Sequence, residues 1–120
     1  MPLLASVLVV LVALLHLYFL VLEMFLWTRP LGLRTFRNTP EKAELTRVLA
    51  ANQGLYNGFL VAGLANGLVL GAAGAGKPWL VFFLGCVVVA GLFGAATASK
   101  KILYVQALPG ALALAAVLFS

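Results

Sequence analysis

Apolar residues fill four long runs of this chain, and short polar segments separate them. The runs cover residues 3–27, 45–73, 79–97 and 102–119. Each run has close to the ~20 residues that an α-helix needs to cross a hydrocarbon core about 30 Å thick. None shows the apolar–polar alternation that is typical of strands in a membrane barrel. The pattern therefore predicts four helices, over residues 3–27, 40–73, 78–98 and 101–119.

The second predicted helix begins before its apolar run. Thr39 stands directly before Pro40 and Glu41. This order is typical of an N-cap, a proline in the first helical position and an acid at the positive end of the helix. Residues 28–39 then form the one sizeable loop, and residues 1–120 form a single transmembrane domain.

The composition favours a membrane as the solvent of this chain. Hydrophobic residues make up 64% of its 120 residues, and charged residues make up 9%. A soluble domain of this length cannot bury so much apolar surface in one core. Because backbone groups in lipid must be hydrogen-bonded within the chain, helices are the expected structure. The predicted fold class is an all-α, integral membrane, four-helix transmembrane bundle with membrane lipid around it.

The basic residues are distributed unevenly among the loops. Seven of the eight lie in or beside the first and third loops: Arg29, Arg34, Arg37, Lys42, Arg47, Lys100 and Lys101. The positive-inside rule then places both loops in the cytoplasm and both termini outside, in a multi-pass protein of the plasma (inner) membrane. Nucleic-acid binding is not expected, because no base-stacking module accompanies the charge. The imbalance also argues against a dual-topology exporter, whereas a parallel homo-oligomer stays open.

Glu23 is the most informative residue, because it is an acid inside the first apolar run. Ionisable residues at membrane depth are costly, and they tend to face a protein interior and to mark function. His16 precedes it by seven residues. At about 100° per residue, that spacing returns to within ~20° of the same helix face. The single histidine and this acid therefore share one stripe.

The second predicted helix carries a broad polar face at a matching depth. Its members are Asn52, Gln53, Tyr56 and Asn57. Since the first two helices are antiparallel, we expect these side chains to meet His16 and Glu23 in one intramembrane polar pocket. Gln53, Asn52 and Tyr56 are the first candidates for the hydrogen-bond partner of Glu23. Lys101 is the candidate ionic partner, and Gln106 on the fourth helix is expected to join the pocket.

Small residues recur at four-residue spacing on the same helix. Gly63, Gly67 and Gly71 continue along the polar face, and Gly54 and Gly58 form a second pair on another face. Such spacing lets two helices approach closely within a membrane. We therefore expect the second helix to be central in the bundle.

The residue patterns that metal binding, nucleophilic catalysis or cofactor binding would need are missing from the sequence. With one histidine, one cysteine and no ligand spacing, the sequence predicts no metal site. It contains no nucleophile motif, phosphate-binding loop or dinucleotide fingerprint, so no cofactor is predicted. Cys86 is expected to be a small buried apolar residue.

Two stretches resemble the hallmarks of a small bacterial and fungal membrane family. They are EMFLW at residues 23–27 and AANQGLYNGF at residues 50–59, and His16, Lys101, Gln106 and Pro109 also fit. The family is catalogued as domain of unknown function 1304. The resemblance covers almost the whole chain. It implies a compact integral membrane protein, and it implies no activity.

Three classes of function remain open. In the favoured one, the pocket binds or transports a small hydrophobic or amphipathic molecule, and Glu23 exchanges a proton during the cycle. In the second, the chain is a membrane enzyme in which His16 and Glu23 perform acid–base chemistry on a lipid-like substrate. In the third, the polar residues fix helix register in a structural or accessory subunit. Whether the chain is an enzyme is left undecided by its sequence.

The charge bias yields a first testable prediction. A cysteine added at either terminus of a Cys86→Ala chain should react with a membrane-impermeant thiol reagent from outside the cell, because both termini are expected there. Labelling of that cysteine from the cytoplasmic side would contradict the orientation.

Overall fold

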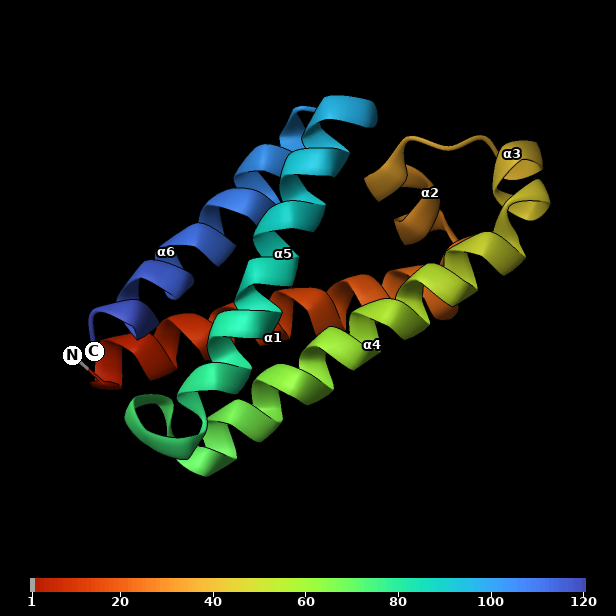
Figure 1. The fold of residues 1–120 in the computed structure, drawn as a ribbon. Helices are drawn as coiled ribbons and strands as arrows, with labels where there is room; N and C mark the ends of the chain where they lie inside the picture. Colours follow the sequence, from red (N-terminus) through yellow and green to blue (C-terminus); the bar gives the residue numbers. More distant parts are fainter. Residues whose placement is uncertain (1) are drawn as a thin grey trace. The chain divides into compact units, whose positions relative to one another are not determined.

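The computed structural model describes residues 2–120, and these residues form helices and turns without any strand. The elements in chain order are α1 (Pro2–Met24), α2 (Pro30–Phe36), α3 (Pro40–Leu45), α4 (Arg47–Leu70), η1 (Gly71–Ala75), α5 (Lys77–Thr97), η2 (Leu103–Ala107) and α6 (Leu108–Leu118) (Figure 1). The elements η1 and η2 are single π-helical turns. The all-α class that the apolar runs predict is confirmed.

Three helices of the described chain are long and apolar enough to cross a membrane. They cover Leu3–Met24, Arg47–Ala75 and Lys77–Thr97. The fourth apolar run forms a shorter apolar helix over Leu103–Leu118. A crossing by this last helix stays a prediction.

The chain divides into two compact units. Unit one consists of residues 2–14 with Ala62–Ser120, and unit two is Leu15–Val61. The division falls inside α1 and α4, so each of these helices contributes one part to each unit.

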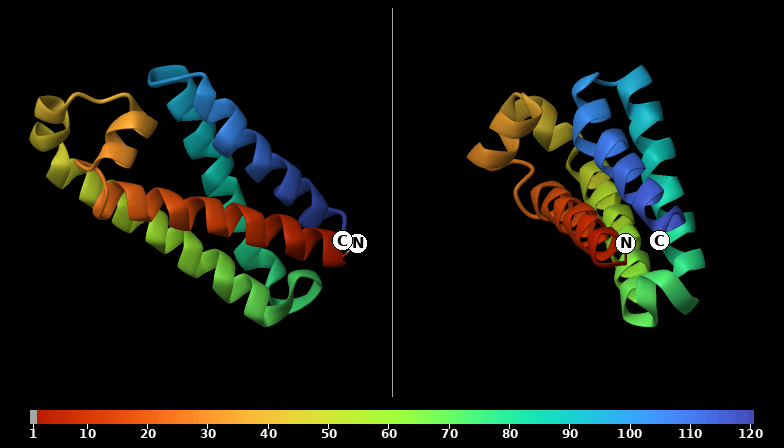
Figure 2. Two further views of the ribbon diagram at one scale, coloured as in Figure 1. Left: turned by 180° about the vertical axis from the view of Figure 1, so that it is seen from behind. Right: turned by 90° about the vertical axis from the view of Figure 1, so that its left-hand side faces the viewer.

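The core of unit one is a helical hairpin in which α5 packs against η2 and α6 (Figures 1 and 2). The backbones approach closely where small residues face each other. A Cβ atom added at Gly91 would lie 2.5 Å from the backbone nitrogen of Ala107. One added at Gly110 would lie 2.7 Å from a methyl group of Val87. Glycine at these two positions is therefore required by the packing of the hairpin.

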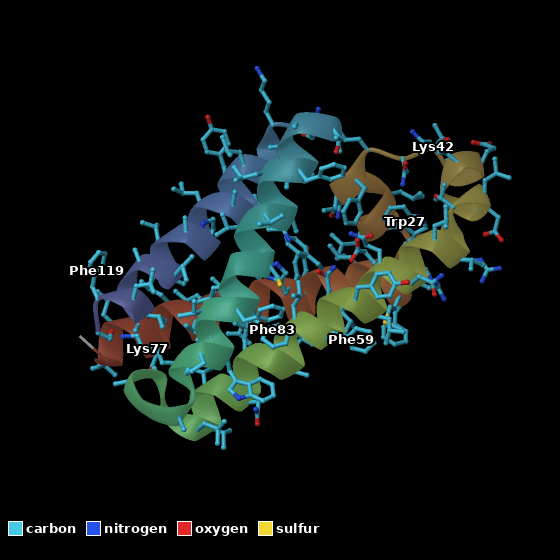
Figure 3. All side chains as sticks on the ribbon, viewed as in Figure 1. Trp27, Lys42, Phe59, Lys77, Phe83 and Phe119 are labelled. Carbon is cyan, nitrogen blue, oxygen red and sulfur yellow. The ribbon has the colours of Figure 1, made fainter. Side chains whose placement is uncertain are left out.

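Lys77 connects the start of α5 to the end of α6 at the open end of this hairpin. Its Nζ atom donates hydrogen bonds of 3.4 Å to the backbone oxygens of Leu118 and Ser120. The last carbonyl groups of a helix lack partners within the helix, so a lysine there satisfies them. Figure 3 shows Lys77 and Phe119 at the same end of the hairpin. The start of α5 and the end of α6 thus lie at one level.

Gly71, which the sequence predicts as a packing residue, lies in the turn between α4 and α5. Gly71 has a φ of +104°, and nothing lies within 4 Å of the place where its Cβ would be. It begins η1, in which the chain leaves α4. The prediction that Gly71 continues the packing stripe is therefore wrong, because a left-handed backbone conformation is what requires glycine there. Gly63 and Gly67 do face α5, against Phe83 and Leu80.

In unit two, residues 28–39 are not the loop that the sequence predicts, because they contain a helix. The short helix α2 occupies most of this segment, with Pro30 in its first turn and Arg37 in a left-handed conformation at its end. A Cβ at Gly32 would collide with the carbonyl group of Leu26. Glycine therefore lets α2 fold directly onto the chain that leaves α1. Pro30 is an ordinary start signal for a helix. The sequence did not predict α2, because seven residues are too few to show a clear apolar period.

The predicted start of the second helix is confirmed, but the helix is not continuous. The Thr39 hydroxyl accepts a hydrogen bond of 3.2 Å from the backbone N–H of Lys42. After one short helix the chain breaks at Thr46, whose φ and ψ are −105° and 9°. The Thr46 hydroxyl accepts a 3.1 Å hydrogen bond from the indole N–H of Trp27. This long-range contact accompanies the break between α3 and α4.

The hairpin packing predicts opposite effects for two glycines of α5. Gly91→Ala should destabilise the protein by about 1–3 kcal/mol, because the new methyl group must displace backbone. Gly85→Ala is the matched control, since nothing lies within 4 Å of its Cβ position. It should be neutral or stabilise α5 by up to ~1 kcal/mol. Thermal unfolding in detergent measures both, and equal melting temperatures would contradict the close approach.

Candidate functional site

The acid of the first apolar run has a hydrogen-bond partner on α4. The side-chain amide Nδ2 of Asn57 donates to Oε1 of Glu23 over 2.6 Å. Both residues belong to unit two. Asn57 is buried and Glu23 is half-buried. A short bond to a charged acceptor is among the stronger hydrogen bonds in proteins, so this contact joins α1 to α4 inside the unit.

A close approach of the two helices makes this bond reachable. A Cβ at Gly54 would lie 2.5 Å from the side chain of Met24 and 3.2 Å from Cβ of Glu23. Gly54 precedes Asn57 by three residues and therefore lies on the same face of α4. The missing side chain at Gly54 brings the backbone of α4 near Glu23, and the short amide of Asn57 then spans the remaining gap. The second glycine pair of the sequence is thus part of the site.

His16 is fully buried on α1, about two helical turns before Glu23. Its ring meets the ring of Phe19 edge-on, with centroids 5.5 Å apart and planes inclined by 71°. The half-buried Glu23 follows it along the same stripe of α1, as the seven-residue spacing predicts. Within residues 2–120, every buried side-chain nitrogen or oxygen has a hydrogen-bond partner. His16 is therefore a satisfied core histidine in this structure.

The other predicted members of the polar face point elsewhere. Asn52 and Gln53 are exposed, and 58% of Tyr56 is exposed. The Tyr56 ring lies beside Phe59, with centroids 6.2 Å apart. Because α4 directs Gly54 and Asn57 toward α1, Asn52 and Tyr56 fall on other faces of the helix. Asn52, Gln53 and Tyr56 are the residues expected first as partners of Glu23, but Asn57 is the one that the structure brings to it.

Lys101 and Gln106 belong to unit one. Lys101 is exposed, and its backbone N–H donates to the Ser99 hydroxyl over 3.2 Å. Gln106 is half-buried and lies in the π-helical turn η2, shortly before Pro109. Proline lacks an N–H and disturbs the helix before it, which accounts for a π-turn at this place. The parts of Lys101 and Gln106 in the site stay predictions.

Two open apolar depressions occur in unit one, and neither includes a predicted site residue. One of about 280 Å³ lies along α5, η2 and α6, where it is lined by Leu92, Tyr104 and Leu108 among others. The second, of about 260 Å³, is lined by Pro78, Trp79, Phe82 and Phe83. The residues that line both depressions are mostly apolar. A pattern of polar residues in the sequence therefore could not have indicated these depressions.

The Glu23–Asn57 pair can bind a further donor. An ionised carboxylate offers about four lone-pair positions, and Asn57 uses one of them. The structure shows no other partner for Glu23 within residues 2–120. A half-buried carboxylate that has one neutral partner can attract a cation or accept a hydrogen bond. Among these described residues, no group of three His, Cys, Asp or Glu side chains is placed to hold a metal ion.

The pair predicts a difference between two asparagines of α4. Asn57→Ala removes the hydrogen-bond partner that the structure shows for Glu23 within residues 2–120, and it should destabilise the protein by about 1–3 kcal/mol. Asn52→Ala is the control, because Asn52 is exposed on the same helix. It should change stability by less than ~0.5 kcal/mol.

A double-mutant cycle assigns the effect to the pair. With Glu23→Gln as the second change, the cycle should give a coupling of about 0.6–1.7 kcal/mol, the range found for hydrogen bonds between membrane helices. Unfolding free energies in detergent measure it. A coupling of zero would mean that Asn57 stabilises the fold without Glu23.

Comparison with known proteins identifies a family for this chain. The model of one family, described as protein of unknown function (DUF1304), matches residues 10–118. No curated protein and no solved structure matches the chain significantly. The matched segment includes His16, Glu23 and Asn57, as well as all of α2 to α6. The chain is a member of the DUF1304 family.

Proposed function

We propose that the protein binds a small hydrophobic or amphipathic molecule within the membrane, at the Glu23–Asn57 pair, and that Glu23 exchanges a proton when the molecule binds or moves. The observation that carries this proposal is the 2.6 Å hydrogen bond between Asn57 and the carboxylate of Glu23 on a predominantly apolar helix. The ligand would reach the pair along the helices from the lipid.

The chemistry of the pair favours this function over a purely structural one. A glutamine at position 23 could hydrogen-bond to Asn57 and fix helix register without the cost of an ionisable group in lipid. A carboxylate adds a negative charge that a proton can remove. Among small amphipathic molecules, a hydrophobic cation is therefore the best-matched ligand. His16 shares the stripe of Glu23 on α1, where it would help to position the carboxylate.

The arrangement that we propose for the chain has four crossings. Lys77 holds the start of α5 at the end of α6, and residues 98–102 join the other ends of the hairpin. The helix over Leu103–Leu118 therefore runs along most of α5, which is long enough to cross a membrane. Four crossings place both termini on one side. The basic first and third loops then lie in the cytoplasm, and the protein lies in the inner membrane.

Binding of two hydrophobic ions of similar shape and opposite charge tests the proposal. In nanodiscs of zwitterionic lipid, the wild type should bind tetraphenylphosphonium more tightly than tetraphenylborate. Acidification should weaken tetraphenylphosphonium binding, because a protonated Glu23 has no charge. Glu23→Gln should weaken it about tenfold, the factor that ~1.4 kcal/mol represents, and should abolish the dependence on pH.

Glu41→Gln is the matched control for this experiment. It removes the same charge from an exposed position on α3, and it should leave both affinities unchanged. The proposal fails if Glu23→Gln binds tetraphenylphosphonium like the wild type. It also fails if neither ion binds and Glu23→Gln only lowers the melting temperature, which is the result that a structural role of the pair predicts.

A further inference from the structure

A second functional feature lies in the polar segment of unit two, outside the Glu23–Asn57 pair. Residues 28–47 hold five basic and two acidic side chains, which leaves three net positive charges. The basic residues are Arg29, Arg34, Arg37, Lys42 and Arg47, and all of them are exposed. We refer to α2 and α3 with their flanking residues 28–47 as the basic platform.

Most of this charge has no counter-ion within the chain. In the part that the structure describes, residues 2–120, the one ion pair joins Arg47 to Glu44 over 3.3 Å. Both members of that pair are exposed, so its contribution is small. Arg29, Arg34, Arg37 and Lys42 are left without an acidic partner. Three of these four are arginines, whose planar guanidinium groups bind phosphate through two parallel hydrogen bonds.

The basic platform is built on fixed contacts with the two membrane helices of unit two. Trp27 stacks obliquely on Phe36 of α2, with ring centroids 4.9 Å apart, and donates its indole hydrogen bond to Thr46. Gly32 lets α2 lie against the backbone of Leu26. Figure 3 shows Trp27 beside the start of α4, and Lys42 on α3. The side chains are therefore carried by an ordered scaffold.

The location of the basic platform fits the headgroup layer of a membrane. It begins four residues after the end of α1 and ends at the first residue of α4, and both of these helices are of membrane-crossing type. Large apolar side chains are exposed next to its charges, with Leu45 86% exposed and Leu31 37% exposed. Basic and apolar side chains on one short helical segment are typical of helices that lie in the interface.

We infer that the basic platform binds the phosphate groups of anionic phospholipids in the leaflet on its side of the membrane. The occupant is a lipid headgroup, since the phosphates of a membrane lie at the depth at which α1 ends and α4 begins. Bound lipid would stabilise unit two and select membranes rich in anionic lipid. This inference does not depend on the function of Glu23.

Fluorescence of Trp27 can report this binding in the full chain. The chain has two tryptophans, so Trp79→Phe leaves Trp27, which contacts α2, as the single reporter. In mixed nanodiscs, brominated phosphatidylglycerol should quench Trp27 more than brominated phosphatidylcholine at the same mole fraction. Increasing salt should reduce the preference, because exposed charges are screened. Inorganic phosphate at equal concentration should not compete.

Two double variants with the same loss of charge distinguish a defined surface from net charge. Arg34→Gln with Arg37→Gln should lower the preference for phosphatidylglycerol about thirtyfold, since each basic residue near the surface contributes about 1 kcal/mol. Lys100→Gln with Lys101→Gln changes exposed lysines of unit one and should retain the preference. Glu23→Gln should also retain it, so failure of the ligand proposal is distinguishable from failure of this one.

Three results would overturn the inference. They are equal quenching by the two lipids, equal losses in the two double variants, and full competition by inorganic phosphate. If the Arg34 and Arg37 variant does not fold, Arg29→Gln with Lys42→Gln removes two other exposed charges of the same platform. That variant should lose the preference to a similar extent, and retention of the full preference by it would equally contradict the inference.

Discussion

The need to partner one carboxylate inside an apolar helix is the constraint on which unit two depends. Glu23 is the one acidic residue among the described positions of α1, and no lysine or arginine lies on that helix. An unpaired acid in lipid costs several kcal/mol, so a donor must come from a neighbouring helix. Asn57 is that donor, and Gly54 brings its helix close enough to serve. The packing of α1 on α4 in this unit and the chemistry of the site therefore have one origin.

The same unit also contains the charged surface that follows α1. Glu23 is one helical turn from Trp27, and Trp27 contacts both Phe36 and Thr46. The short helices α2 and α3 are thus attached to the end of the helix that carries the acid. A bound anionic headgroup would stabilise this attachment, and a ligand at Glu23 would act one turn away. Both binding surfaces that we propose, which have opposite charge, therefore lie within Leu15–Val61.

Strong local signals made much of the fold predictable from the sequence. The apolar runs predicted the long helices, and Thr39 predicted the start of α3 through its N-cap bond. The break at Thr46 was not predictable, because it accompanies a bond to Trp27 that lies 19 residues away. The α2 helix was missed because a helix of seven residues has no clear period, and its position depends on contact between Gly32 and Leu26.

The site was predictable in part for a similar reason. Matched depth and the cost of a buried acid indicated a partner for Glu23 on the second helix. Periodicity placed Asn52, Gln53, Tyr56 and Asn57 on one broad face, but it did not give the rotation of α4. The close approach at Gly54 sets that rotation and selects Asn57. The most direct test is difference infrared spectroscopy of the Glu23 carboxyl group in lipid, identified by its loss in Glu23→Gln. We predict that Asn57→Ala shifts this band while Asn52→Ala leaves it in place; a band unaffected by Asn57→Ala would contradict the account.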